Sequence, residues 1–148
     1  MSIDGSLQPA RDARTGEVAL PRIFVADTEL QSSYISSLKK FSTPTEATVN
    51  KWYSDAFDIL RTESFSAYII NPSLTFRDEN SNIVVSGIDL ATRIRESDAY
   101  SDSRIWVLCG DSAALQLAQA TGFRNVYLKD TGSMEQFFIH LRDYLLAG

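Results

Sequence analysis

Ile23-Phe24-Val25-Ala26-Asp27 is a short apolar run that ends in an acid. The run is too short for a helix face, so it predicts a strand buried on both sides. Three later segments have the same form, an apolar run followed by a polar residue: Tyr68–Asn71, Ile105–Asp111 and Val126–Lys129. The carboxyl ends of parallel strands meet at one edge of a sheet. The polar residues after these runs therefore define one candidate pocket.

Helical patterns alternate with these strands. The first three- and four-residue spacing predicts a helix that carries Leu30, Tyr34, Leu38 and Phe41 on one face. Ser86 is expected to cap a helix with Ile88, Ala91 and Ile94, and a further helix spans about Ser112–Ala120 and ends at Gly122. For the last helix, Ser133 and Gln136 form a capping-box pattern before an apolar stripe made of Met134, Phe137, Phe138, Leu141 and Leu145.

Two regions have weaker signals. A short strand is expected within Ala47–Tyr53, followed by a helix that Ser54 caps and that turns Phe57, Ile59 and Leu60 toward the core. Pro72–Val85 is polar in its middle and is interpreted as a long loop. Loops of this length are often functional or disordered.

Length and charge restrict the class of protein. The 148 residues, 44% of them hydrophobic, suit one domain; residues 1–20 lack periodicity and are expected to form a flexible tail before a domain at 21–148. The net charge of -5 argues against a nucleic-acid partner, because phosphate contacts need clustered Lys and Arg. A single cysteine excludes an internal disulfide, and no apolar run suits a membrane span. We expect a cytoplasmic protein without membrane contact.

Strands that alternate with helices, and that are apolar on both faces, predict an α/β fold with a parallel sheet covered on two sides. Right-handed crossovers leave few topologies. The element number and order match the flavodoxin-like, doubly wound five-stranded sheet with strand order 2-1-3-4-5 and helices on both faces.

Four motifs carry a closer resemblance: IFVADTE from Ile23, SGIDLATRIRE from Ser86, IWVLCGDS from Ile105 and VYLKD from Val126. From about Arg22 to Ala147 the chain resembles the CheY-like receiver domain of bacterial response regulators. In that family two acids after the first strand and an aspartate after the third strand hold magnesium, and the last of these accepts a phosphoryl group. A hydroxyl after the fourth strand and a lysine after the fifth contact that group.

This chain departs from the pattern at most of these positions. Asp27 matches the first acid and Lys129 matches the lysine, but Thr28, Asn71 and Cys109 replace the second acid, the phosphoacceptor and the hydroxyl residue. An amide offers no nucleophile that yields a labile acyl phosphate, and magnesium usually needs one or two carboxylates. We therefore expect a degenerate phosphorylation pocket with no catalytic residue, metal or cofactor, in which Lys129 pairs with Asp27.

The resemblance then implies a non-catalytic pseudo-receiver that acts by protein–protein interaction in a two-component or phosphorelay system, independently of aspartyl phosphorylation. Its partner would be a sensor kinase, another regulator or an output protein, and a homodimer is an open possibility. The family uses the surface of the fourth helix, fifth strand and fifth helix. Here Tyr127 and Tyr144 are expected to be exposed anchors on that surface. The aromatic residue that switches in the family falls at Val126, with Tyr127 displaced by one position.

Alternatives stay open at this point. Asp27 also suits a helix cap, Asn71 before Pro72 suits a turn, and Cys109 suits a small buried hydrophobe. His140 is expected to face solvent. The competing function is a haloacid-dehalogenase-like phosphatase with Asp27 as nucleophile, supported by faint matches at Ser112 and Lys129.

Overall fold

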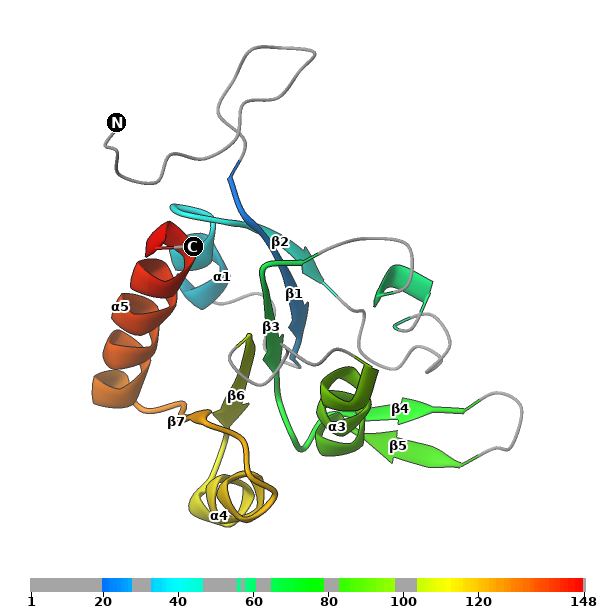
Figure 1. The fold of residues 1–148 in the computed structure, drawn as a ribbon. Coiled ribbons are helices and arrows are strands. Elements are labelled where there is room, and N and C mark those ends of the chain that lie inside the picture. Colours follow the sequence, from blue (N-terminus) through cyan, green and yellow to red (C-terminus); the bar gives the residue numbers. More distant parts are fainter. Residues whose placement is uncertain are drawn as a thin grey trace.

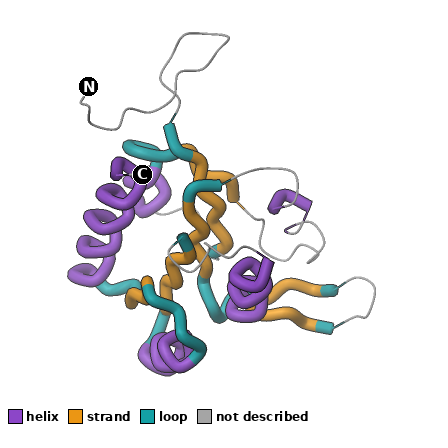
Figure 2. The backbone as a smooth tube through the Cα atoms, in the orientation of Figure 1, coloured by secondary structure: helices purple, strands orange, loops and turns teal. Residues whose placement is uncertain are grey.

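The structure is a computed structural model that describes residues 20–27, 33–46, 56, 58–60, 65–78, 83–97 and 104–147. Several sequence predictions lie outside these residues: the tail before Leu20, Leu30, the strand within Ala47–Tyr53, the Ser54 cap, Phe57 and Thr28. The described elements form a central sheet with helices on both faces (Figures 1 and 2).

The central sheet is parallel throughout and has the order β2-β1-β3-β6-β7. Its strands are β1 (Arg22–Ala26), β2 (Thr43–Glu46), β3 (Ala67–Ile70), β6 (Ile105–Cys109) and β7 (Asn125–Leu128). Numbered along the chain within this sheet alone, the order is 2-1-3-4-5, which confirms the predicted flavodoxin-like fold.

Two apolar layers cover the sheet. On one face α1 (Ser33–Leu38) and α5 (Thr131–Ala147) pack on alternate strand residues such as Ile23 and Val25. On the other face α3 (Gly87–Ser97) and α4 (Ser112–Ala120) pack with a helical segment at Ala56 and residues 58–60. Period-two alternation explains why one strand serves both layers, since Phe24 and Ala26 point to the second face. Within the described residues, no helix has the length and apolar character of a membrane span.

The predicted helix boundaries are confirmed for α3 and α4. Ser86 caps α3, because the Asp89 backbone amide donates to Ser86 Oγ at 3.2 Å while the Ser86 amide donates to Asp89 Oδ2 at 3.3 Å. Asp111 caps α4 by accepting from the Ala114 amide at 2.8 Å, and Gly122 follows the helix with φ 95°. That left-handed conformation suits glycine, which has no Cβ.

For α5 the predicted cap was wrong by one turn. The helix starts at Thr131, and its cap is Asp130, whose Oδ1 accepts from the Ser133 amide at 2.8 Å. An Asp three residues before Ser133 competes for the same role and lies closer to the end of β7. The apolar stripe is confirmed, with Phe137, Leu141 and Leu145 buried in the core.

The second strand of the sheet lies before the stretch Ala47–Tyr53, in which the sequence predicts a strand and which is outside the described residues. β2 covers Thr43-Pro44-Thr45-Glu46, paired with β1 from Arg22↔Thr43 to Val25↔Glu46. Its polar sequence and its proline hide it from an apolar pattern. Both features are tolerated because β2 is an edge strand, where one row of backbone groups needs no ladder partner.

The segment interpreted as a loop at Pro72–Val85 contains a hairpin instead. β4 (Thr75–Arg77) and β5 (Val84–Ser86) pair antiparallel and form a separate two-stranded sheet that extends beside α3 (Figure 1). Strands of three residues give too short an alternation to detect, yet Phe76 is buried and ties the hairpin to the core.

Candidate functional site

Asp27 and Asn71 end adjacent strands. β1 and β3 run parallel with Ala26 opposite Ile70, so the next residues of both strands emerge at the same edge. The Asn71 amide donates to the Ala26 carbonyl at 2.8 Å and continues the ladder by one step. Both side chains are buried among apolar strand ends. The predicted proximity of these two residues is confirmed.

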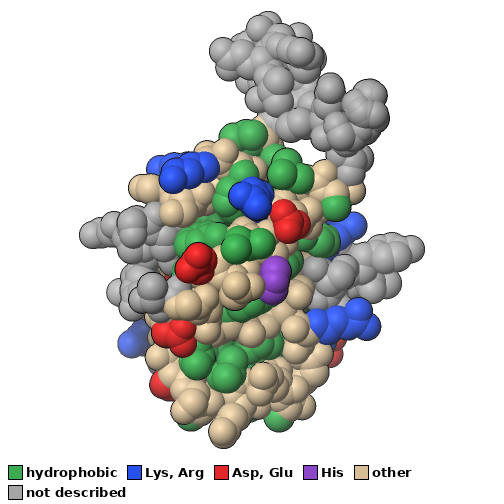
Figure 3. Space-filling model, turned by 90° about the vertical axis from the view of Figure 1, so that its left-hand side faces the viewer, with side chains coloured by type: hydrophobic (Ala, Val, Ile, Leu, Met, Phe, Trp, Pro, Cys, Tyr) green, Lys and Arg blue, Asp and Glu red, His purple; other side chains and the backbone are tan. Residues whose placement is uncertain are grey.

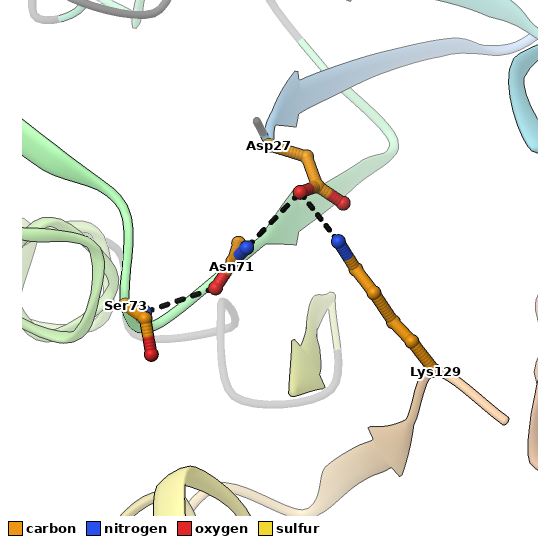
Figure 4. Close-up of polar contacts among 4 residues, drawn as sticks. All are labelled: Asp27, Asn71, Ser73 and Lys129. Atoms are coloured by element: carbon orange, nitrogen blue, oxygen red, sulfur yellow. Dashed lines mark hydrogen bonds and ion pairs between the residues drawn. The ribbon is translucent and has the colours of Figure 1, made fainter. Parts of the chain in front are cut away.

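Lys129 reaches the same point from β7 (Figure 4). Its Nζ lies 2.6 Å from Asp27 Oδ1, with the Asp27 side chain fully buried and the Lys129 side chain 11% exposed. The backbone holds the lysine in place, because the Lys129 amide donates to the Cys109 carbonyl at 2.9 Å. A buried carboxylate needs such a partner, since isolated charges are strongly disfavoured away from water.

Asn71 uses both ends of its side chain. Its Nδ2 donates to Asp27 Oδ1 at 3.1 Å, and its Oδ1 accepts from the Ser73 amide at 2.9 Å (Figure 4). The Leu74 amide also donates to the Asn71 carbonyl, at 3.2 Å. The turn interpretation of Asn71 is therefore correct, and the same side chain also belongs to the pocket. The helix-cap interpretation of Asp27 concerns residues 28–32, which lie outside the part of the chain that the structure describes.

Gly87 supports this corner from α3. A Cβ at Gly87 would overlap the Asn71 carbonyl oxygen, so α3 can approach the turn this closely only through a glycine. The Gly87 amide donates to the Leu74 carbonyl at 2.6 Å. The motif that begins at Ser86 contains this glycine, but its contact with Asn71 depends on how α3 packs against the turn after β3.

Cys109 is the last residue of β6, and its side chain is fully buried, in agreement with the interpretation of Cys109 as a small buried hydrophobe. Burial, with a smaller contribution from Asp111, raises the thiol pKa from 9.0 to about 11, although Lys129 acts in the opposite direction. The thiol is therefore protonated at neutral pH and a poor nucleophile.

These residues do not fit a magnesium ion. Oδ1 of Asp27 already accepts from two donors, and one of these is the amide nitrogen of Asn71, where a metal site would need an oxygen ligand. Among the residues that the structure describes, no group of three or more His, Cys, Asp or Glu side chains could hold a metal ion. An ammonium–carboxylate pair thus balances the charge that a cation would balance in an acid-rich pocket.

Tyr127 and Tyr144 lie away from this pocket, and their side chains are less exposed than the sequence predicted. Both are half-buried and pack on Trp106 from the α5 side of the sheet, with the Tyr127 ring stacked at 6.1 Å between centroids. His140 is exposed as expected, but its Nδ1 shares a 2.6 Å hydrogen bond with the Tyr127 hydroxyl. Tyr127 faces the α5 side because successive strand residues point to opposite faces, and Tyr127 comes one position after Val126.

The apolar groups that do reach the surface on α4 and α5 are aliphatic. Leu117 is 53% exposed, Leu146 is 47% exposed and Ile139 is 37% exposed. Figure 3 shows the α5 side of the molecule, where hydrophobic side chains reach the surface in patches, with positively and negatively charged side chains between them.

Comparisons with known proteins agree with this architecture. No protein-family model and no curated protein sequence matches the chain. Similar solved structures include a CheY-like receiver domain protein from Methanospirillum hungatei, at 13% identity and a TM-score of 0.62, with 86% of this chain and 94% of that chain covered. The chemotaxis response regulator CheY4 of Vibrio cholerae gives 14% identity and 0.62, with 86% and 100% covered.

A third similar structure is the response regulator DrrB of Thermotoga maritima, an OmpR/PhoB homologue, at 14% identity and a TM-score of 0.60. The match covers 85% of this chain but 52% of DrrB, so this chain spans about half the length of that protein. The TM-scores of 0.60 to 0.62 show that the fold is similar, and at 13–14% identity these matches show the fold alone. With its 2-1-3-4-5 parallel sheet and the polar strand ends at Asp27, Asn71 and Lys129, the chain has the fold of the response-regulator receiver domains.

Proposed function

We propose that this chain is a pseudo-receiver, a signalling module of the two-component type that acts through protein contacts without aspartyl phosphorylation. The proposal rests on the chemistry and the hydrogen bonds of the Asn71 side chain. The position that would accept a phosphoryl group is an amide, and both of its polar ends are bonded within the domain. An amide in this position has no carboxylate oxygen for attack on a phosphodonor.

The rest of the pocket supports the same conclusion. Phosphoryl transfer depends on a metal and positioned donors that stabilise the charge of the transferred group. Here Lys129 is already engaged with Asp27, and a buried thiol stands in the hydroxyl position. Thr28, in place of the second acid, removes another oxygen ligand of the kind that magnesium prefers.

A phosphatase that uses Asp27 as nucleophile is disfavoured. The carboxylate is fully buried, and its Oδ1 accepts from both Lys129 and Asn71, so a substrate would have to displace both donors. Ser112, the other residue of the faint match, is exposed at the start of α4, whereas Asp27 is buried.

For partner contacts we propose the face of α4, β7 and α5. Its exposed apolar groups are Leu117, Ile139 and Leu146, which suit contact with another protein better than with water. Tyr127 and Tyr144 would support this face from below rather than contact the partner through exposed rings. The partner would be a kinase, another regulator, an output protein or a second copy of the chain.

Incubation with acetyl phosphate and magnesium, followed by intact-mass measurement, tests the central claim. The protein should gain no phosphoryl group, and Asp27→Asn should behave identically. Addition of one phosphoryl group to the unmodified protein would overturn the proposal, and the Asp27→Asn variant would then show whether Asp27 is the acceptor.

Contact through the proposed face is tested separately. Leu117→Glu and Leu146→Glu should weaken self-association or partner capture, while Asn71→Ala should not, provided that circular dichroism shows each variant folded. Loss of association in Asn71→Ala alone would place the contact at the pocket instead.

A further inference from the structure

The β4–β5 hairpin leaves and rejoins the domain at a single point next to Asn71. The Gly87 amide donates to the Leu74 carbonyl at 2.6 Å, and the Ile88 amide donates to the Pro72 carbonyl at 3.3 Å. Residues on the two sides of the hairpin are therefore bonded directly to each other. Any movement of the hairpin as a unit must be taken up by this junction.

The hairpin is fixed at its base and exposed at its far end. Phe76 and Leu74 are each 1% exposed, whereas Ile83 and Val84 are 60% and 56% exposed. Register places Phe76 opposite Val85, so one face of the ribbon is anchored in the core near Asn71. A force on the exposed end would act on the base through this short, paired ribbon.

From the base, hydrogen bonds lead to β7. The Ser73 amide binds Asn71 Oδ1 at 2.9 Å, and Asn71 Nδ2 binds Asp27 Oδ1 at 3.1 Å. Lys129 Nζ binds the same oxygen of Asp27 at 2.6 Å (Figure 4). Two donors from different strands share one acceptor atom, so a shift of Asn71 changes the geometry available to Lys129.

Beyond Lys129 the connection continues into α5. Asp130, the next residue, caps the helix through the Ser133 amide at 2.8 Å and accepts from the Met134 amide at 2.9 Å. The start of α5 is thus joined to Lys129 through the neighbouring residue Asp130.

We propose that the β4–β5 hairpin is coupled to Lys129 and the start of α5 through the side chains of Asn71 and Asp27. Displacement of the hairpin would then shift β7 and α5 without any chemistry in the pocket. This coupling supplies an input for a module without a phosphoacceptor and so rests on the proposed function. Its test uses neither phosphodonor nor partner, so the two can fail separately.

The coupling is measurable by backbone and side-chain NMR on the full chain. Phe76→Leu alters the hairpin anchor while keeping an apolar side chain. It should shift the Asn71 side-chain amide, the Lys129 ammonium and the backbone amides of Lys129 and Asp130. The matched control is Phe123→Leu, another buried phenylalanine of the same core layer, which should leave those four signals in place.

Removal of the link provides the decisive comparison. In an Asn71→Ala background, Phe76→Leu should no longer shift the Lys129 and Asp130 signals, because the side chain that links the hairpin base to Asp27 is gone. This comparison separates coupling from mere spatial proximity. Coupling is reciprocal, so Lys129→Met as a single substitution should shift the Gly87 amide signal. This experiment can be done even if Asn71→Ala does not fold. Equal shifts from Phe76→Leu and Phe123→Leu, persistence of the effect in Asn71→Ala, or no response of Gly87 to Lys129→Met would overturn the proposal.

Discussion

The ammonium of Lys129, the residue after β7, lies 2.6 Å from Oδ1 of Asp27, the residue after β1, although β3 and β6 separate these two strands in the sheet. The Asp27 side chain has no exposed surface, so this pair is a buried one, with a charge that water cannot stabilise. Buried pairs add little stability in comparison with an apolar replacement, but loss of one partner is costly. Lys129 is therefore the cationic partner on which the buried carboxylate of Asp27 depends.

Lys129→Met should lower the free energy of unfolding by about 3 kcal/mol at neutral pH, because it leaves a buried carboxylate without its cation. Denaturant unfolding followed by circular dichroism measures this value. The double variant Asp27→Asn/Lys129→Met removes both charges and should recover most of the loss. A double variant as unstable as the sum of the two single variants would show that the pair does not act as a unit.

Asn71→Asp should destabilise the domain at neutral pH, since the new carboxylate would stand where an amide now lies 3.1 Å from Asp27 Oδ1. Two carboxylates at that separation repel by about 5 kcal/mol at an effective dielectric of about 20, partly offset by Lys129. The repulsion raises the pKa of the acid pair, so the loss of stability should appear as the pH rises from about 4 and be absent below it.

Magnesium provides the matching readout for that variant. Two carboxylates form a better site for a hard cation than one, so millimolar magnesium should raise the melting temperature of Asn71→Asp but not that of the unmodified protein. Equal stabilisation of both proteins would contradict the conclusion that the natural pocket does not fit the ion.

Gly87→Ala should lower the free energy of unfolding by about 1–3 kcal/mol, the usual cost of overpacking a core. The added methyl group would overlap the Asn71 carbonyl, and backbone cannot move aside as a flexible side chain could. Gly110→Ala is a matched control, because a Cβ there meets nothing within 4 Å and no positive φ is involved. Similar stabilities of the two variants by chemical denaturation would show that the close approach of α3 is not required.

The central strands and the pocket were predictable because both depend on local signals. An apolar run such as Ile23–Ala26 identifies a buried strand, and the parallel-sheet rule then brings Asp27 and Asn71 together without any knowledge of side-chain rotamers. The helix cap at Ser86 followed from residue type in the same way.

The remaining features depend on tertiary context. β2 is polar because it is an edge strand, and the hairpin strands are too short to show a period, so neither Thr43–Glu46 nor Thr75–Arg77 has a recognisable pattern. The burial of Tyr127 against Trp106 could have been inferred, since strand alternation places it on the face opposite Val126. Its bond to His140 could not, because that bond depends on the rotation of α5 against the sheet.

Cys109 should make the domain less stable in alkali. The folded state holds the thiol proton more tightly than the unfolded chain, with a pKa of about 11 against 9.0. The stabilising contribution is therefore complete below about pH 9 and is lost as the pH rises through about 11, a change on the order of 2 kcal/mol. Cys109→Ala should lose less stability than the unmodified protein between pH 8 and about 11. Parallel stability curves for the two proteins would contradict the raised pKa.

Restoration of the family's residue set should restore chemistry only when the set is complete. Asn71→Asp alone is expected to remain unphosphorylated by acetyl phosphate and magnesium, because Thr28 supplies no second acid and Cys109 supplies no hydroxyl. A nucleophile gains little when the metal and the donors that stabilise the transferring group are missing. The triple variant Thr28→Asp, Asn71→Asp and Cys109→Thr, with Lys129 retained, should gain one phosphoryl group. Intact mass detects it, and its release in base would mark an acyl phosphate. Equal phosphorylation of the single and triple variants would show that the Asn71 substitution alone keeps the pocket inactive. No phosphorylation of the folded triple variant would show that these missing side chains are not what prevents the reaction.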